Sequence, residues 1–550
     1  EKKQPHITQY IKNNDNSSNK TKDSTQKITE NEVIKQLEQL KTNSAPGPDQ
    51  ISPKLLKEAR HELTPIITHL FNISINNSFV PTQWKEANII PVPKIPKPIE
   101  NSDFRPISLT SCLCKVLERL ICKRIIHLTQ NIWQNNQQFG FLPGKSTSDA
   151  VIQVIDDWGK AVDQNQTIQA IFFDFSKAFD LVDHEILLSK LEKILPKWIT
   201  SWIAAYLIKR KQRVTTKEYT TEWKNVEAGV IQGSVLGPTL FILFIADINS
   251  YLPSNIKAPK YADDILAYCI YKNPKENNIQ EAADALHKWT NINKMKLNVK
   301  KTQQMIINPR VVPIKNNEQL NYDENGRIKC NMCTKTLVNL KGYNIHRATT
   351  HKNHYANQKI SIENEDLITC DNYKYLGTNI NNKMNWDTHW EIVSKKINSN
   401  LYLIKTMKKL KFKTEILTTV YKSLILSIII TNSITLCSTT KNAQNEIENI
   451  QNQAFKIIGI KKDEAKNKYN IDTTQELIDK HCIKKLEKII NDPIHPITKS
   501  LKKRNEEMVT QRRNFKYHQV ECKTTTYQQS FVPKYLKAIA ENAQSNLTQY

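Results

Sequence analysis

The stretch KYADDILAY, residues 260–268, places two adjacent aspartates, Asp263 and Asp264, inside an otherwise apolar segment. Its apolar flanks and polar centre predict a strand, a tight turn and a second strand. Neighbouring carboxylates repel each other, and burying an unpaired carboxylate is unfavourable by several kcal/mol. Taken alone, such a pair is more typical of an ordinary hairpin turn than of a chemical site. A functional reading therefore needs a counter-charge.

A second acidic strand end lies upstream, in IFFDFSKAFD, residues 171–180. If the two strands are neighbours in one sheet, Asp174 lies close to Asp263 and Asp264. Mg²⁺ would offset the charge of such a cluster, because this hard ion prefers carboxylate oxygens and also binds phosphates. Two such ions about 4 Å apart stabilise the attacking and leaving oxygens of a phosphoryl transfer. The sequence therefore predicts a two-magnesium site, provided that the strands are neighbours.

The composition indicates a large, basic chain. It has 550 residues, with 79 Lys and Arg against 54 Asp and Glu, which gives a formal net charge of +25. The length predicts several domains. The charge favours a polyanionic partner such as nucleic acid, with solvated surfaces as the alternative. Ten mostly isolated cysteines, a polar N-terminus and a longest apolar run of only residues 424–430 indicate an intracellular protein that needs no membrane.

Seven segments then follow in a characteristic order: NIIPVPK with FRPISL, QFGFLPGKST, AIFFDFSKAFD, GVIQGSVLGPTLF, KYADDILAY, KLNVKKT and YKYLGTNI. From about residue 45 to beyond residue 390, this order resembles the reverse transcriptases of non-LTR retrotransposons, the LINE-type and jockey-like group. The resemblance implies an α+β right-hand polymerase with fingers, a palm built on an antiparallel sheet, and a helical thumb. It also implies synthesis of DNA on an RNA template.

The resemblance implies catalytic roles for several residues. Asp174 and Asp263 would bind magnesium, and Asp264 would be a nearby acid that can also ligate. Lys301 occupies the place of a lysine that protonates the pyrophosphate leaving group, although the adjacent Lys300 competes for this role.

Further residues would bind the incoming nucleotide. Phe179 would be a steric gate whose ring rejects a 2′-hydroxyl, and a core aromatic is the alternative. Gln232 and Gly233 would contact the base and the template. Lys94 and Arg105 would hold the triphosphate, because a guanidinium binds phosphate bidentately and a lysine supplies a point charge.

One motif lies outside the polymerase pattern. The spacing C-x2-C-x12-H-x4-H predicts a structural zinc ion held in a ββα zinc finger by Cys330, Cys333, His346 and His351. Leu337 and Tyr343 fall where such a finger needs its small core, and His354 is an alternative to His351. Zinc would fold a module this short. The finger is expected to be either a structural knob or a contact for template RNA or target DNA.

The expected organisation is as follows: a disordered segment 1–30, N-terminal helices and fingers 31–165, palm 166–307, zinc finger 325–356, primer-grip-like hairpin 357–390, and basic helical thumb and C-terminal region 391–550. No segment of the endonuclease type is recognisable. Either the chain is a fragment, or an endonuclease domain or protein supplied elsewhere is expected as its partner.

These observations lead to one main hypothesis. The chain is expected to extend a primer or target DNA on template RNA with deoxynucleoside triphosphates, in the nucleus or shuttling as a ribonucleoprotein. The alternative is a catalytically idle or domesticated nucleic-acid-binding protein. An RNA-dependent RNA polymerase is disfavoured, because an aromatic at Phe179 rejects ribonucleotides.

Overall fold

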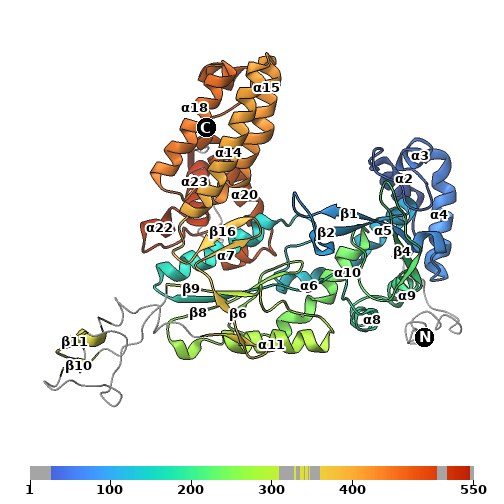
Figure 1. Cartoon of the computed structure of the whole chain (residues 1–550), viewed down its shortest axis with the longest axis horizontal. Coiled ribbons are helices and arrows are strands. Elements are labelled where there is room, and N and C mark those ends of the chain that lie inside the picture. The colour runs from blue at the N-terminus through green and yellow to red at the C-terminus, as the bar shows by residue number, and fades with distance from the viewer. Residues whose placement is uncertain are drawn as a thin grey trace.

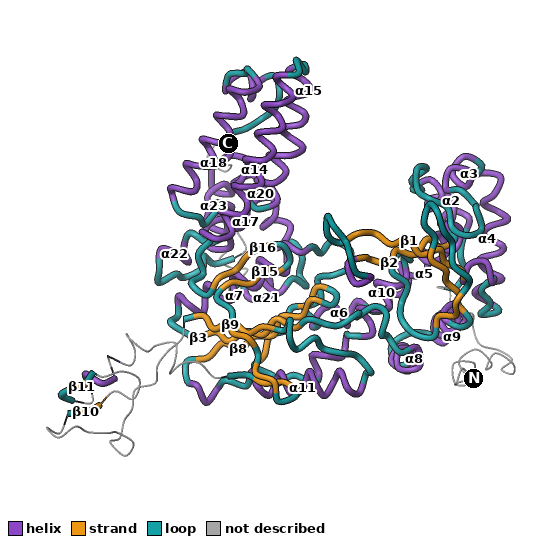
Figure 2. Tube along the Cα trace, in the orientation of Figure 1, coloured by secondary structure: helices purple, strands orange, loops and turns teal. Residues whose placement is uncertain are grey.

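The computed structural model describes residues 26–308, 327–329, 335–339, 341–344, 346, 359–503 and 517–545. Two sheets and a C-terminal group of helices make up the body of the molecule (Figure 1). Helices separate many of the strands along the chain, and strands that are neighbours in a sheet are often far apart in sequence (Figure 2).

The central sheet has six strands in the order β14-β9-β3-β8-β6, with β7 paired to β8. The strands are β3 (Thr167–Phe173), β6 (Ile256–Lys257), β7 (Lys260–Tyr261), β8 (Asp264–Tyr271), β9 (Gln303–Ile307) and β14 (Ile368–Thr369). Every residue of β3 is buried, since the sheet is covered on both faces. Helix α7 (Thr147–Asp163) packs on one face and α11 (Ile279–Ile292) on the other (Figure 1).

The N-terminal sheet has the order β2-β1-β4-β5. Its strands are β1 (Glu86–Pro93), β2 (Phe104–Thr110), β4 (Arg210–Val214) and β5 (Lys224–Val226). The helices around it and toward the central sheet are α2 (Glu30–Glu38), α3 (Pro53–Glu58), α4 (Arg60–Asn76), α5 (Cys112–Leu128), α6 (Gln130–Asn135), α8 (His184–Glu192), α9 (Lys197–Leu207) and α10 (Leu236–Phe244), with short 3-10 turns at η1 (Thr82–Lys85), η2 (Asn101–Asp103), η3 (Ala246–Ser250) and η4 (Pro274–Glu276).

The expected disordered segment 1–30 is wrong at its C-terminal end, and residues 1–25 lie outside the described residues. Ile28 is 1% exposed, and its N–H donates to Asn72 Oδ1 at 2.9 Å. Thr29 caps α2 in a capping box with Glu32. A buried apolar residue directly before the cap fixes the entry of the chain into the helix, which places residues 26–29 in the folded body.

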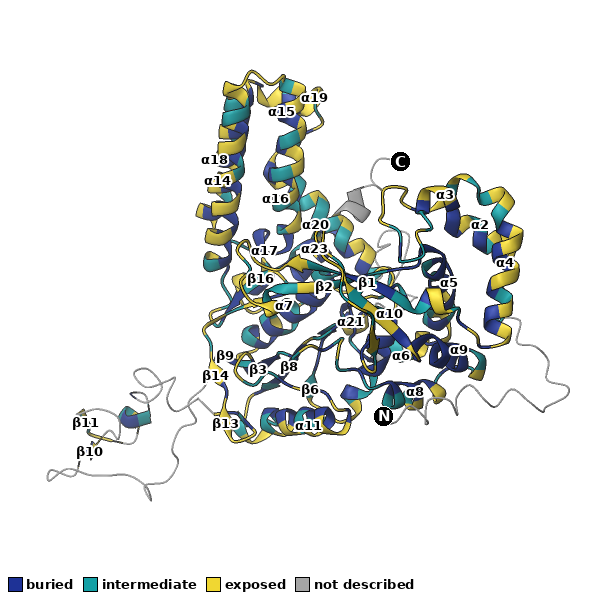
Figure 3. Cartoon of the chain, turned by 45° about the vertical axis from the view of Figure 1, so that its right-hand side comes forward, coloured by how far each residue is buried: buried dark blue, intermediate teal, exposed yellow. Residues whose placement is uncertain are grey.

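The C-terminal helical region follows the hairpin of β15 (Asn372–Tyr375) and β16 (Thr378–Asn381). It forms a second hydrophobic core, to which Ile152 of α7 contributes, and its long helices stand out from the central sheet with exposed outer faces (Figures 1 and 3). Its helices are α14 (Asp387–Lys409), α15 (Thr414–Tyr421), the π-helical turn η5 (Lys422–Leu426), α16 (Ser427–Thr431), α17 (Ser433–Leu436), α18 (Lys441–Ile458), α19 (Lys462–Asn467), α20 (Thr474–Ile490), α21 (Pro496–Ser500), α22 (Thr525–Gln528) and α23 (Phe531–Ser545).

One helical run in this region, Thr414–Thr431, is long and apolar enough to cross a membrane by length and composition alone. Leu417, Tyr421, Ile425 and Ile429 repeat every four residues along it and are 0% exposed inside the C-terminal core. A core helix shows this pattern of one buried stripe.

Candidate active site

The aspartate pair lies in a tight turn, as the sequence predicted. Strands β7 and β8 are antiparallel neighbours, with Tyr261 paired to Asp264. Ala262 has a φ of 57°, in the left-handed region that a residue with a side chain rarely adopts. The turn is supported from outside the hairpin, because the side chain of Gln138 accepts the N–H of Ala262 at 3.1 Å through Oε1.

The segment just before α7 runs alongside this turn. Lys260 donates its N–H to Gln137 O at 2.9 Å, and Phe139 donates to Lys260 O at 2.8 Å. A Cβ on Gly140 would lie 2.6 Å from the nitrogen of Ala262. Only glycine permits this approach, so the QFG segment is fitted to the turn of residues 261–264, the predicted catalytic turn.

Asp174 lies beside the turn because of the strand register. In the antiparallel pair of β3 and β8, Phe173 faces Ile265. Asp174 follows Phe173 and Asp264 precedes Ile265, so the register places these two aspartates next to each other. The N–H of Asp174 donates to Thr302 Oγ1 at 3.3 Å, and Asn298 donates its N–H to Asp174 O at 2.8 Å. Burial raises the pKa of the Asp174 carboxyl, and the Lys301 ammonium opposes that rise.

The three carboxylates lie within electrostatic reach of one another. Burial raises the pKa of Asp264 to about 6, and the charges of Asp263 and Asp174 add to this rise. Burial also raises the pKa of Asp263, with Asp174 contributing. Among the described residues, no three His, Cys, Asp or Glu side chains converge closely enough to hold a metal by themselves. The set fits Mg²⁺ all the same, because this ion takes one or two carboxylates and completes its shell with water and substrate phosphates.

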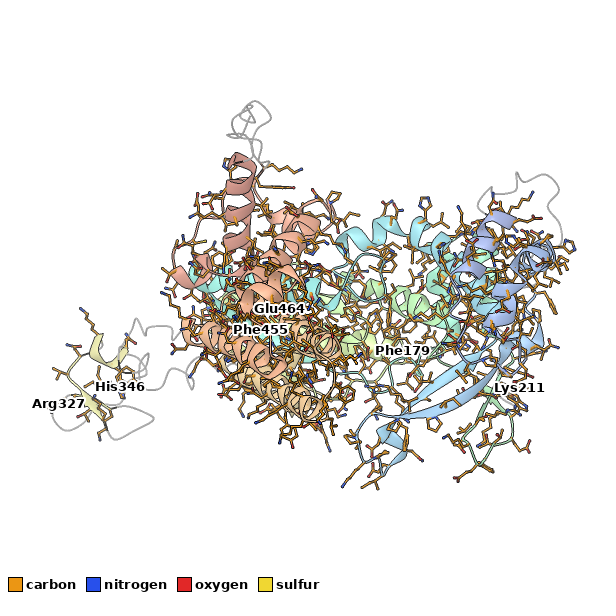
Figure 4. The ribbon with its side chains drawn as sticks, turned by 90° about the horizontal axis from the view of Figure 1, so that it is seen from above. Phe179, Lys211, Arg327, His346, Phe455 and Glu464 are labelled. Carbon is orange, nitrogen blue, oxygen red and sulfur yellow. The ribbon has the colours of Figure 1, made fainter. Side chains whose placement is uncertain are left out.

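An aromatic cluster surrounds the predicted gate. The ring of Phe179 stacks on Phe241 of α10, with centroids 4.5 Å apart and an interplanar angle of 15°. Phe141 meets Phe179 edge-on at 6.1 Å and 87°. Phe141 is 43% exposed and has a φ of 58°, which is an outlier for a bulky residue. Phe179 is partly buried and packs against the core around α10; Figure 4 marks its place.

The predicted base-contacting turn joins the gate to the N-terminal sheet. Val230 donates its N–H to Phe179 O at 2.8 Å, and Ser108 of β2 donates to Gln232 O at 2.7 Å. Gly233 has a φ of 114°, and a Cβ there would lie 2.5 Å from Ser108 O. The glycine is therefore required both by its conformation and by the close approach of β2.

Of the two predicted phosphate-binding residues, Lys94 acts electrostatically on Asp180, the residue that follows Phe179. Burial raises the pKa of Asp180, and Lys94 is one of the cations that oppose the rise. The ammonium of Lys94 also donates to Ser102 O at 2.7 Å. Arg105 is exposed on β2, where it pairs in register with Val92, and no carboxylate among the described residues forms an ion pair with it.

Sequence reasoning missed Glu118, which is 0% exposed in the middle of α5. Its Oε2 accepts the N–H groups of Val235 at 2.7 Å and Leu236 at 2.9 Å, and its Oε1 accepts the hydroxyl of Tyr206 at 3.1 Å. The carboxylate therefore caps α10 directly after the Gln232–Gly233 turn. A single acid on an apolar helix face, in CLCKVLERLIC, is the signal that could have revealed it.

Tyr373 of β15 was not singled out either. Its ring stacks on Phe172 with centroids 3.8 Å apart and an interplanar angle of 13°. Burial raises its pKa to about 12, with Asp264 and Asp174 contributing. The hairpin β15–β16 therefore packs against β3, two residues before Asp174.

The predicted zinc-finger residues fall mostly outside the described residues, including Cys330, Cys333 and His351. What is described has the expected order: β10 (Ile328–Lys329) pairs antiparallel with β11 (Thr336–Leu337), and residues 341–344 and 346 are helical. Tyr343 is 1% exposed and His346 is 5% exposed. Figure 4 shows His346 and Arg327 together, well away from Phe179. The strands β12 (Ser361–Ile362) and β13 (Glu365–Asp366) follow.

Comparison with known proteins agrees with this geometry. The sequence model of the family described as reverse transcriptase (RNA-dependent DNA polymerase) matches residues 93–380. The chain belongs to this family.

Two of the curated relatives come from the fly Drosophila melanogaster. The probable RNA-directed DNA polymerase from transposon BS is 33% identical over 290 residues, covering 50% of this chain and 31% of that protein. The RNA-directed DNA polymerase from mobile element jockey is 29% identical over 286 residues, covering 50% and 31%. The chain thus spans about a third of the length of these relatives. A solved apo telomerase from Candida tropicalis aligns with a TM-score of 0.32 and 13% identity over 47% of this chain and 56% of that one, a similarity too low to carry an argument.

Proposed function

We propose that this chain is an RNA-directed DNA polymerase of a jockey-like non-LTR retrotransposon, which adds deoxynucleotides to a primer 3′ end. The observation that carries the proposal is the register of β3 and β8, because it sets Asp174 beside Asp264 at one end of the sheet. The printed names of the Drosophila relatives support the same activity. The expected sites of action, the nucleus or a shuttling ribonucleoprotein, remain part of this proposal.

Within this proposal, Asp174, Asp263 and Asp264 hold two magnesium ions. When bound, these ions offset the charge that develops on the attacking and leaving oxygens. Lys301, which lies near Asp174, donates a proton from Nζ to the departing pyrophosphate. The hairpin that carries Tyr373 packs on Phe172, two residues before Asp174, and would place a primer 3′ end there.

The substrate would lie between the two sheets. Lys94, whose charge acts on Asp180 next to Phe179, would pair with the triphosphate, together with Arg105 from β2. Gln232 and Gly233 would contact the base and the template. The ring of Phe179, held from behind by Phe241, would collide with a 2′-hydroxyl.

The outer face of α14 supports a nucleic-acid partner. Lys395, Lys396, Lys405 and Lys409 are all exposed there, and none of them forms an ion pair in the part of the chain that the structure describes. Tyr402 lies among them and is 74% exposed. Unpaired ammonium groups neutralise phosphates, and an exposed ring packs on a sugar or base. Template RNA and primer DNA are the partners that fit this face.

The test is primer extension on an RNA template with magnesium and deoxynucleotides, comparing the chain with Asp263→Asn. We expect extension by the wild type and loss of at least about a thousandfold in the variant, while RNA binding is retained. Binding without extension by either protein would instead support an idle nucleic-acid-binding protein.

Sugar selection gives a separate test. Replacement of Phe179 by Val removes the ring but keeps an apolar side chain against Phe241. The preference for deoxynucleotides over ribonucleotides is expected to fall by roughly tenfold to a hundredfold in competition assays, as for other losses of steric discrimination. Phe241→Leu is the matched control, because it removes the ring on which Phe179 stacks and keeps the ring of Phe179 itself. Unchanged discrimination in Phe179→Val would show that the ring is only a core aromatic.

We further infer that residues 325–356 fold around one zinc ion held by Cys330, Cys333, His346 and His351. The support is the ligand spacing in the sequence, the β10–β11 pair and the burial of Tyr343 and His346. One zinc per chain is expected by metal analysis, with loss in Cys330→Ser and Cys333→Ser, while Cys370→Ser retains it. If the variant that carries both Cys330→Ser and Cys333→Ser still contains one zinc per chain, this site is contradicted.

A further inference from the structure

We propose that the C-terminal helices α20 and α21 position the catalytic turn and the gate ring through residues 137–149, here named the brace segment. The inference rests on the proposed polymerase function for its activity readout and extends it beyond residues 93–380, the range of the family match. The brace segment contacts the active site at one end and the C-terminal region at the other.

The contacts at the active-site end involve both backbone and ring. Gln138 accepts the N–H of Ala262, and Phe139 and Gln137 bond to the backbone of Lys260. Two residues further along, Phe141 meets the ring of Phe179. Phe141 holds a left-handed φ of 58° although it is bulky and 43% exposed. Such a conformation persists only where the surrounding structure holds it.

The contacts at the other end are charged. Lys485 Nζ of α20 lies 2.8 Å from Asp149 Oδ1, and the two side chains are 13% and 5% exposed. Lys145 Nζ lies 2.5 Å from Asp492 Oδ2, with exposures of 16% and 32%. Lys488 Nζ donates to Gly144 O at 3.1 Å.

A ring contact adds to these pairs. His495, the N-cap residue of α21, lies edge-on to Phe139 with centroids 6.1 Å apart. Phe139, the neighbour of Gln138 in the brace segment, therefore contacts the start of α21 directly.

Few residues separate the two ends. Between Phe141 and Lys145 the chain contains only Leu142, Pro143 and Gly144, and Lys145 donates its N–H to Leu142 O at 3.3 Å. Pro143 has a fixed φ, and the hydrogen bond from Lys145 to Leu142 closes the turn around Gly144. We expect a displacement at Lys145 to reach Phe141 through this closed turn. We expect it to reach the catalytic turn through Phe139, which contacts both His495 and Lys260.

The experiment reverses one ion pair. Lys145→Glu and Asp492→Lys each place like charges together, and the double variant restores an opposite pair. We expect roughly a tenfold loss of extension rate in each single variant, a magnitude typical of coupling through packed contacts. We also expect a weaker preference for deoxynucleotides, with recovery of both in the double variant. Lys145→Arg is expected to behave as the wild type.

The matched control is the ion pair of Lys480 and Asp472, whose atoms lie 2.7 Å apart on the same C-terminal region. Lys480→Asp, Asp472→Lys and their double variant make the same charge changes without contacting the brace segment, and they should leave rate and sugar preference unchanged. The proposal is overturned if the Lys480 and Asp472 variants lose as much extension rate as the Lys145 and Asp492 variants. It is also overturned if the single Lys145 and Asp492 variants keep the wild-type preference for deoxynucleotides.

A second readout does not depend on activity. Hydrogen exchange of the Ala262 amide, which is bonded to Gln138, should become faster in each single variant and recover in the reversed pair. Unchanged exchange would overturn the proposed positioning even if the enzyme were active. Absence of extension by the wild type would overturn the polymerase assignment alone, because the exchange experiment still decides the role of the brace segment.

Discussion

Two groups of aspartates in this molecule have pKa values shifted in opposite directions. Burial raises the pKa of the active-site carboxyls, and repulsion by neighbouring carboxylates adds to the rise at Asp263 and Asp264. Hydrogen bonds and cations outweigh burial and lower the pKa in the C-terminal contacts. The first group is Asp174, Asp263 and Asp264, and the second is Asp149, Asp163 and Asp492.

The difference comes from the partners of each group. Asp163 accepts the N–H groups of Lys523 at 2.9 Å and Thr524 at 2.6 Å, and Asp149 pairs with Lys485. In the active site, the neighbours that act on Asp264 are other carboxylates. Charge that the fold satisfies serves stability, whereas charge that the fold leaves unsatisfied marks a site that is completed by a ligand.

The largest expected contrast is between activity and stability at the active site. Asp174→Asn should abolish primer extension, by roughly a thousandfold or more, since the site loses a metal ligand. In magnesium-free buffer its free energy of unfolding should stay within about 1 kcal/mol of the wild type or rise, because an unfavourable charge is removed. Urea unfolding and extension assays on the same preparations measure both. A marked loss of stability would show that Asp174 is a structural residue.

The opposite result is expected at the C-terminal contact. Asp149→Asn leaves the ammonium of Lys485 almost buried without a charged partner, so the free energy of unfolding should fall by about 3 kcal/mol. The control Asp472→Asn removes a carboxylate whose partner Lys480 is 67% exposed, and it should change stability by less than about 1 kcal/mol. Equal losses in the two variants would remove the distinction between these aspartates.

The smallest effect concerns pH and the C-terminal tail. The pKa of Asp163 is lowered in the folded chain, since hydrogen bonds from Lys523 and Thr524 outweigh burial. Its stabilisation is therefore present above the unfolded pKa of about 4 and is lost as the pH falls further toward the folded value. Protection of the Thr524 amide against hydrogen exchange should decrease over that window in the wild type. Asp163→Asn should show weaker protection at pH 7 and little change on acidification.

Much of the site could be predicted from local pattern. The strand, turn and strand of residues 260–268 follow from apolar flanks around a short polar centre, and the structure confirms them. The order of the seven segments was sufficient to indicate the family, which the match to residues 93–380 confirms. The disordered segment was placed too far along the chain, because polar composition does not show that Ile28 has a buried place to fill.

What the sequence by itself determined is which chemical groups the chain carries and in what order, because motifs and strand patterns are local. Tertiary structure alone decided which of these groups meet. The register of β3 and β8 puts Asp174 beside Asp264, and the packing of α5 brings Glu118 to the start of α10. Likewise, Lys145 reaches Asp492 across 347 residues of chain. Contacts at such separations depend on the packing of whole elements, and no local pattern of residues encodes them.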